Sequence, residues 1–246
     1  VTRCVSVAAE MGVRTIRLTG GEPLMRPNVH RLIQQLTRLP RIEEVALTTN
    51  GLLLTDQAAG LAEAGLSRLN VSLDSLDEGR FETISRRSGL QRILEGLEEA
   101  GRQGFRSIRI NAVSIRGLTE QEIVPLAMFC REHRFHLRFI EFMPLDAEDA
   151  WSRQHVLTGL EVRRILEMHI GQLKRREPED SGQPSVDYSY VDGHGIVGFI
   201  NPVSQPFCDR CDRLRLTADG QFRNCLFSSK DWDARALLRG GGTNKD

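Results

Sequence analysis

The sequence has no excess of charge of either sign and no apolar run long enough to cross a bilayer. Its 246 residues include 33 Lys plus Arg and 33 Asp plus Glu, so the formal net charge is zero. A neutral chain has no global positive field to gather nucleic acid or anionic lipid, and a membrane span needs about 20 apolar residues. No signal-peptide pattern opens the chain either. We therefore expect no nucleic acid and no membrane as partners, and a cytoplasmic location.

Cysteine is also scarce, with five in the chain. Thiols stay reduced in the cytoplasm, so we interpret these cysteines as buried or ligating rather than disulfide-bonded. Cys4 and Cys130 lie among apolar residues of helical segments and are predicted to be small core residues. The histidines without ligand spacing are predicted at surfaces and helix ends: His30, His133, His136, His155 and His169.

Up to residue 145, strand-like and helix-like segments alternate along the chain. Strands are predicted at residues 15–19, 45–49, 69–73, 107–114 and 137–142, and helices at 29–39, 56–64, 90–103 and 120–133. This alternation predicts an α/β fold with a parallel sheet and right-handed crossovers. The periodicity leaves open whether the sheet closes into a barrel.

A different pattern follows, so we divide the chain into two units, residues 1–145 and 146–246. In the second unit a helix begins at Thr158, and Glu161 completes a capping box three residues later. The elements predicted there are a helix at 158–171 and strands at 187–191 and 196–200.

Three cysteines in the second unit have the spacing of a metal site. Cys208 and Cys211 form a C-x2-C pair, which brings two sulfurs onto one turn, and Cys225 follows across a predicted hairpin. Three thiolates suit an iron–sulfur cluster with one open iron, or a zinc site with a fourth ligand. His194 is the nearest candidate for that fourth ligand. The spacing alone leaves both metals open.

Arg213, Leu214 and Arg215 lie between these cysteines on a predicted strand. Alternation along a strand places both guanidinium groups on one face and Leu214 on the other. Two arginines beside a metal site favour a phosphate-bearing ligand, because each can bind an oxyanion through two hydrogen bonds. A solvated strand face is the alternative interpretation.

Gly20, Gly21 and Glu22 directly follow a predicted strand. Two glycines let a ligand approach the backbone closely, and the glutamate can hold a cationic amino group. Ligands bind at the carboxyl ends of parallel strands, so we expect the strand ends to form one site. Further polar clusters end the later strands, at residues 48–51, 70–74 and 141–143.

Three arginines lie inside predicted strands and are flanked by apolar residues: Arg17, Arg109 and Arg138. A single strand arginine is usually an edge or surface charge. Three in one sheet predict a polar lumen that faces an anion.

Together these motifs resemble the radical SAM superfamily, whose glycine-glutamate motif receives the amino group of S-adenosylmethionine. More narrowly, the chain resembles the GTP 3′,8-cyclase family of molybdenum cofactor biosynthesis over essentially its whole length. The resemblance rests on residues 16–24, 47–51, 69–74, 138–143 and 208–215, followed by Cys225.

The resemblance implies an incomplete, TIM-like (β/α) radical SAM barrel with a C-terminal region that holds an auxiliary [4Fe–4S] cluster on Cys208, Cys211 and Cys225. At the position of Arg109 many relatives have lysine, which keeps the charge but changes the hydrogen-bond geometry. The residues implied at the S-adenosylmethionine site are Gly20, Gly21, Glu22, Asn50, Ser72 and Met143. Those implied at the GTP site are Arg17, Thr48, Arg109, Arg138, Arg213, Leu214 and Arg215.

The chain departs from the family in one large respect. The C-x3-C-x2-C motif, which binds a second [4Fe–4S] cluster that cleaves S-adenosylmethionine, is absent, and Cys4 cannot replace it. We expect this motif and the first barrel strand to precede Val1 in the intact protein, and a glycine-ended tail to follow Asp246. The chain alone should therefore be unable to start the radical reaction, and no catalytic residue is assigned within it.

In the intact enzyme, the resemblance implies removal of hydrogen from C3′ of GTP and closure of C3′ onto C8 of guanine. It also implies an electron donor and a downstream partner, cyclic pyranopterin monophosphate synthase; it leaves the oligomeric state, a homodimer included, undetermined. Two alternatives stay open: another radical SAM enzyme with an auxiliary cluster, such as a peptide-modifying one, and a zinc-bearing binding module.

Overall fold

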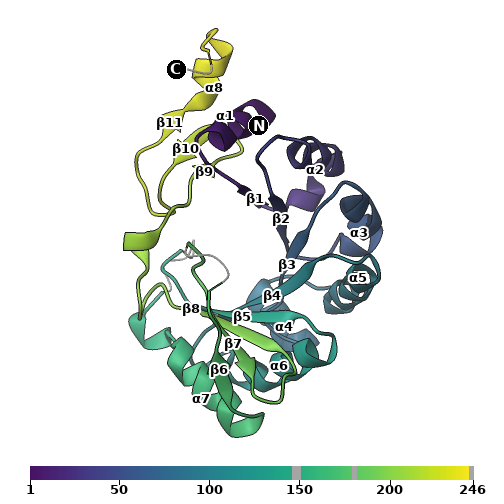
Figure 1. The fold of residues 1–246 in the computed structure, drawn as a ribbon. Helices are drawn as coiled ribbons and strands as arrows, with labels where there is room; N and C mark the ends of the chain where they lie inside the picture. The colour runs from purple at the N-terminus through teal and green to yellow at the C-terminus, as the bar shows by residue number, and fades with distance from the viewer. Residues whose placement is uncertain (146–150, 179–181, 244–246) are drawn as a thin grey trace.

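The computed structural model describes residues 1–145, 151–178 and 182–243, and its centre is an eight-stranded sheet. The strand order is β1-β2-β3-β4-β5-β8-β7-β6, so β1 and β6 are the two edges of an open arc (Figure 1). Strands β1 to β5 and β8 pair in parallel, while β7 and β6 pair antiparallel. The strands are β1 (Thr15–Leu18), β2 (Glu44–Thr49), β3 (Arg68–Ser72), β4 (Ser107–Ser114), β5 (His136–Glu141), β6 (Leu173–Arg175), β7 (Val186–Tyr190) and β8 (Ile196–Ile200).

Helices cover the outer side of the arc, as Figure 1 shows for α2, α3 and α5. Apolar residues at helical spacing make this packing favourable: Leu90, Ile93 and Leu97 of α5 are all buried and share one core with Leu47 and Leu69 of the sheet. The helices are α1 (Thr2–Glu10), α2 (Val29–Thr37), α3 (Leu54–Glu63), α4 (Glu78–Ser85), α5 (Leu90–Arg102), α6 (Ile123–Glu132) and α7 (Gly159–His169). Short 3-10 turns are η1 (Pro23–Met25), η2 (Glu120–Glu122) and η3 (Arg153–His155).

The predicted α/β architecture with a parallel sheet is confirmed, and the structure decides the point that periodicity left open, because the sheet does not close. One predicted helix, at 120–133, begins as the 3-10 turn η2 and becomes α-helical only at Ile123. Pro125 lacks an N–H, so it fits only the first turn of an α-helix, which is where it lies. The capping box of Thr158 and Glu161 is present at the start of α7.

Sequence analysis missed α1, α4 and β6. Helix α1 buries only Val5 and Ala9, and α4 buries only Phe81, so neither has a wide apolar stripe. Strand β6 has three residues and buries only Leu173. The predicted division at residue 145 stays a prediction: residues 146–150 lie outside the described residues, and β8 of the second unit pairs with β5 of the first.

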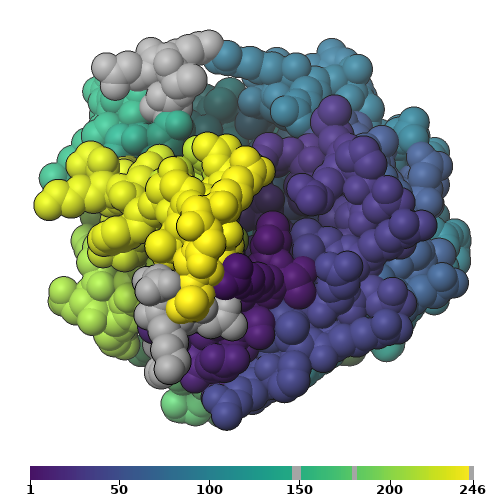
Figure 2. All heavy atoms as spheres, turned by 90° about the horizontal axis from the view of Figure 1, so that it is seen from above, coloured from purple at the N-terminus to yellow at the C-terminus, as the bar shows by residue number. Residues whose placement is uncertain are grey.

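After β8 the chain crosses the open side of the arc to a small three-stranded antiparallel sheet beside α1 (Figures 1 and 2). Arg3 of α1 donates a hydrogen bond from Nη2 to the Gly242 carbonyl at 2.7 Å. Of the helices in the described part of the chain, none is long and apolar enough to cross a membrane. The elements are η4 (Cys208–Arg210), β9 (Arg215–Leu216), β10 (Gln221–Arg223), β11 (Trp232–Asp233) and α8 (Ala234–Arg239).

Candidate active site

The glycine-glutamate loop lies at the carboxyl end of β1 and is tied to the end of β2. The Oε1 atom of Glu22 accepts hydrogen bonds from the Leu24 backbone N–H at 2.9 Å and the Thr49 hydroxyl at 2.7 Å, and Oε2 accepts from the Asn50 N–H at 2.7 Å. A carboxylate oxygen accepts about two hydrogen bonds, so Oε1 is fully used and Oε2 can accept a further bond. Glu22 therefore orders two strand ends and keeps acceptor capacity for a ligand's amino group.

The two glycines before Glu22 leave the backbone open. Gly20 has φ +139°, a conformation that L side chains rarely adopt, and a Cβ atom added at Gly20 or Gly21 would meet no other atom within 4 Å. Ser72 is exposed at the end of β3, and Asn50 and Met143 are half-buried at the ends of β2 and β5. These strand ends can therefore receive a ligand that forms hydrogen bonds to the main chain. S-adenosylmethionine, predicted here from the same residues, is such a ligand.

Below this edge, arginines from several strands face one interior. Arg17 on β1 and Arg68 on β3 both pair with Ala46, so the three side chains share one face of the sheet. Arg17 is open to solvent, yet desolvation by the surrounding protein is the main reason that its pKa falls to about 10; the charges of Arg68, Arg138 and Arg213 add to the shift. Such crowding of positive charge on a concave surface favours a multiply charged anion.

The other predicted strand residues lie in the same interior. Thr48, Asn70 and Arg109 are neighbours across β2, β3 and β4, and Arg138 on β5 is level with Ser72 through Asn111 of β4. Arg109 and Arg138 are buried. The structure therefore brings the predicted nucleotide residues of the strands together, directly beneath the predicted S-adenosylmethionine residues.

Arg138 also has an acidic neighbour that sequence analysis did not find. Its Nη2 lies 3.4 Å from Oδ2 of Asp187 on β7, although β8 separates the two strands. The contact is possible because β8 has Gly198 at this level, where a Cβ atom would overlap Ser185 Oγ and Asp187 Oδ1. Arg138 and Gly198 thus accommodate Asp187 on the inner face of the sheet.

Asp187 is charged in this setting. Burial works against its charge, but the nearby His136 side chain, the positive charge of Arg138 and the Ser185 hydroxyl together hold its pKa well below the usual range. His136 Nε2 lies 3.5 Å from Asp187 Oδ2, and burial lowers the pKa of His136. The prediction that His136 lies at a surface or helix end is wrong: it begins β5 and faces this buried carboxylate.

Arg68 was missed for a different reason. It begins a strand and forms an ion pair with Glu44, which is what an edge charge would do. Only the sheet register shows that Arg68 points to the same interior as Arg17. The signal in the sequence was its position two residues before Asn70, which places both side chains on one face of β3.

The C-terminal arginines differ in part from the expectation. The strand predicted over residues 213–215 begins only at Arg215, and Arg213 precedes it. Leu214 is 53% exposed, whereas both arginines are half-buried. The Arg213 guanidinium lies 5.1 Å from the centroid of the Phe207 ring, and its Nε donates to Cys211 Sγ at 3.3 Å.

The three predicted thiol ligands are free and exposed. Cys208 and Cys211 flank the turn η4, and pairing of Arg215 with Arg223 brings Cys211 and Cys225 to the same end of the β9–β10 hairpin. The backbone N–H of Arg213, followed by its side chain, lowers the pKa of Cys211, which favours the thiolate that iron requires.

Three thiols are chemically suited to hold an iron–sulfur cluster, but the structure does not place them close enough together to do so. In residues 1–145, 151–178 and 182–243, no three His, Cys, Asp or Glu side chains form a group that could hold a metal ion. His194, the candidate fourth ligand for zinc, is exposed in the turn before β8, whereas Cys208 follows the other end of that strand. Cys130 is buried as predicted, and burial raises the pKa of its thiol, while Cys4 is only half-buried.

Two family models match the chain. The Radical SAM superfamily model matches residues 3–130, and the Molybdenum Cofactor Synthesis C model matches residues 135–246. The solved structure of Streptococcus suis SuiB bound to S-adenosylmethionine superposes with a TM-score of 0.68 over 98% of this chain and 57% of that one. At 15% identity this likeness shows the fold alone.

Curated relatives carry the sequence likeness. A GTP 3′,8-cyclase of Rhodopirellula baltica is 47% identical over 94% of this chain and 65% of its own length. A GTP 3′,8-cyclase of Thermodesulfovibrio yellowstonii is 38% identical over 100% of this chain and 76% of its own length. The chain thus spans about two thirds to three quarters of these relatives. It belongs to the GTP 3′,8-cyclase family of the radical SAM superfamily.

Proposed function

We propose that the intact protein is the radical SAM GTP 3′,8-cyclase of molybdenum cofactor biosynthesis, which converts GTP to (8S)-3′,8-cyclo-7,8-dihydroguanosine 5′-triphosphate. The observation that carries this proposal is the strand register, which places arginines of β1, β3 and β5 on one face of the sheet. Arg213 of the C-terminal segment lies near enough for its charge to contribute to the lowered pKa of Arg17. A triphosphate is the kind of ligand that such a cluster binds, because several guanidinium groups can each contact separate oxygens.

The substrate would lie between the strands of the arc and the C-terminal segment 207–243, which we call the cysteine hairpin. Arg17, Arg109 and Arg138 would hold the phosphates from the strand side, with Thr48 beside them. From the hairpin side, Arg213, Leu214 and Arg215 would enclose the nucleotide and exclude water. Two sets of contacts from opposite sides would fix the ribose, and fixing a reactant in this way lowers the entropic part of the barrier.

The S-adenosylmethionine site would occupy the strand ends above the arginines. Glu22 would accept a hydrogen bond from the amino group of the cofactor, supported by Asn50, while the main chain of Gly20 and Gly21 lies open beside it. Ser72 and Met143 would complete the lining. When bound, S-adenosylmethionine and its cluster supply the hydrogen-abstracting radical, and this chain contributes position and shelter from water.

An auxiliary [4Fe–4S] cluster would be held by Cys208, Cys211 and Cys225, and its iron without a cysteine ligand would be available to coordinate the substrate. The spacing of the three thiols and the positive charge beside Cys211 support this assignment. A second cluster, the electron donor and the downstream synthase remain predictions from the resemblance. The cytoplasmic location remains a prediction from the composition of the sequence, and the oligomeric state stays undetermined.

The proposal is tested by reconstituting the 246-residue chain anaerobically with iron and sulfide, then titrating it with GTP. We expect about four irons per chain and a cluster spectrum that GTP alters. A Cys225→Ser variant, which removes a predicted ligand, should retain less iron. Cys130→Ser is the matched control and should behave like the parent. Zinc in place of iron, or a cluster spectrum indifferent to GTP, would contradict the proposal.

A further inference from the structure

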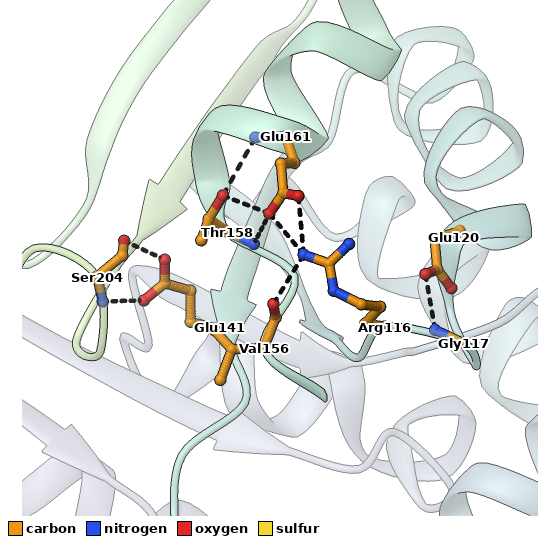
Figure 3. A network of polar contacts seen from close by, with 8 residues as sticks. All are labelled: Arg116, Gly117, Glu120, Glu141, Val156, Thr158, Glu161 and Ser204. Carbon is orange, nitrogen blue, oxygen red and sulfur yellow. Dashed lines mark hydrogen bonds and ion pairs between the residues drawn. The ribbon is translucent and has the colours of Figure 1, made fainter. Parts of the chain in front are cut away.

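The last residue of β5, Glu141, is a buried carboxylate that the proposed reaction does not use. Its side chain is 2% exposed, and both oxygens accept hydrogen bonds from the loop after β8. Oε2 accepts from the backbone N–H groups of Val203 at 3.0 Å and Ser204 at 2.8 Å, and Oε1 accepts from the Ser204 hydroxyl. Figure 3 shows Glu141 and Ser204 facing each other across this contact.

These bonds are of the strong kind. A carboxylate accepting from N–H and O–H groups forms charge-assisted bonds about twice as strong as neutral ones. Strand β5 does not need them, because it is already paired along its length with β4 and β8. Their effect falls instead on residues 201–206, where the backbone bond from Gln205 N–H to the Asn201 carbonyl at 3.0 Å is local to the loop.

The contact between Glu141 and Ser204 lies close in sequence both to the cysteines and to Met143 at the strand end. Ser204 lies four residues before Cys208, and four residues extend to at most about 14 Å. Glu141 lies two residues before Met143 at the strand end. Fixing Ser204 on Glu141 therefore limits where the cysteine segment can begin relative to the edge that carries Met143.

We propose that Glu141 is a positioning residue that anchors the cysteine-bearing segment to the carboxyl end of β5, and so sets the distance between the auxiliary-cluster thiols and the strand-end cofactor site. The consequence for GTP rests on the proposed function, but the anchoring itself does not. Glu141 touches no reacting group in this arrangement, because Oε2 faces the backbone of residues 203–204 and Oε1 faces the Ser204 hydroxyl.

The anchoring is tested by hydrogen exchange of the 246-residue chain with Glu141→Gln and Ser204→Ala variants. Glutamine keeps the shape of the side chain but replaces one acceptor oxygen with an amide that cannot accept. We expect the Val203 and Ser204 amides to exchange at least tenfold faster in Glu141→Gln, and about threefold faster in Ser204→Ala. Segment 205–211 should follow, while the β4 amides stay within twofold of the parent.

Glu161→Gln is the matched control. Glu161 belongs to the neighbouring network in Figure 3, where it bonds to Thr158 and Arg116 but not to residues 203–204. It should loosen the start of α7 and leave the 203–204 amides unchanged. Unchanged 203–204 exchange in Glu141→Gln, or equal loosening in the control, would overturn the proposal.

A second measurement separates this proposal from the proposed function. After iron reconstitution, Glu141→Gln should weaken the GTP response of the cluster at least fivefold and leave iron content within a quarter of the parent. A parent chain that ignores GTP would count against the cyclase proposal, while the exchange result would still decide the role of Glu141.

Discussion

The strand arc and the cysteine hairpin both contribute to the candidate site, but they are held together in different ways. The arc has a continuous core, in which Leu47, Leu69 and Leu97 are fully buried. Among the described residues after Ile200, none is buried, and Trp232 and Leu237 stand partly in solvent. The hairpin instead carries three free thiols at its surface.

Hydrophobic burial therefore fixes the arrangement of the strand residues, whereas a bound metal would fix the arrangement of the thiols. A short segment without a core is rarely stable alone, and a metal can supply the missing free energy. The strand residues are therefore held in place by packing, while the thiols would reach their final arrangement on binding iron. Glu141 and the Arg3 contact limit how far the hairpin can move in the meantime.

The largest expected effect is on the free energy of unfolding, which should respond to a cavity in the arc but not to one in the hairpin. Leu97→Ala in the arc should lower the free energy of unfolding by about 2–5 kcal/mol, because it leaves a cavity in a closed core. Leu237→Ala in α8, at a residue 42% exposed, should change it by about 0.5 kcal/mol or less. Urea denaturation of both variants measures this. Similar losses would mean that the hairpin has a core of its own.

Iron removal should act on the hairpin alone. In the iron-loaded chain, a chelator should raise hydrogen exchange in residues 207–233 about tenfold, because the thiols lose their common ligand. The β2–β4 amides should not respond, since hydrophobic packing holds them. A change that spreads across the arc would show that the two regions unfold as one unit.

Arg213 and Leu214 are neighbours in the hairpin whose contributions to GTP binding should differ. Arg213→Ala should weaken GTP binding by about 1.5–3 kcal/mol, the range for a hydrogen bond to a charged group. Leu214→Ala removes an exposed side chain and should cost less. Isothermal titration of the iron-loaded chain with GTP compares the two. An unchanged affinity for GTP in Arg213→Ala would place the arginine outside the nucleotide site.

The smallest effect concerns pH and the start of α7. The Thr158 hydroxyl, with Arg116 also contributing, lowers the pKa of Glu161 from 4.5 to about 2, so its stabilising contribution is complete above pH 4.5 and is lost as pH falls toward 2. Glu161→Gln should therefore cost about 1 kcal/mol at pH 7, and the difference from the parent should vanish near pH 2. Denaturation curves across this range test the sign; a difference that grows in acid would refute it.

Much of the arc was predictable because its signals are local. Strand 107–114 and the capping box of Thr158 are set by the pattern of neighbouring residues, and both are confirmed. The contact between Arg138 and Asp187 was not predictable, because it depends on β8 lying between β5 and β7. No local pattern contains that strand order.

The site residues divide along the same line. Glu22 was expected at the strand end, but its three bonds to the ends of two elements appear only when β1 and β2 lie side by side. Arg68 has the local pattern of an ordinary strand-start charge, and only the register turns it toward Arg17. That the three thiols bind a metal stays a prediction from their spacing, and their arrangement depends on a segment with little packing to define it.

Gly198 of β8 makes the residues at positions 138 on β5 and 187 on β7 depend on one another. Because the glycine has no side chain, Arg138 and Asp187 can meet across β8, and any larger residue would displace the carboxylate. Changes at these three positions should therefore not accumulate independently among descendants of this sequence. We expect lineages that lose Gly198 to lose the acidic partner as well, so the three positions should vary together in an alignment of close relatives.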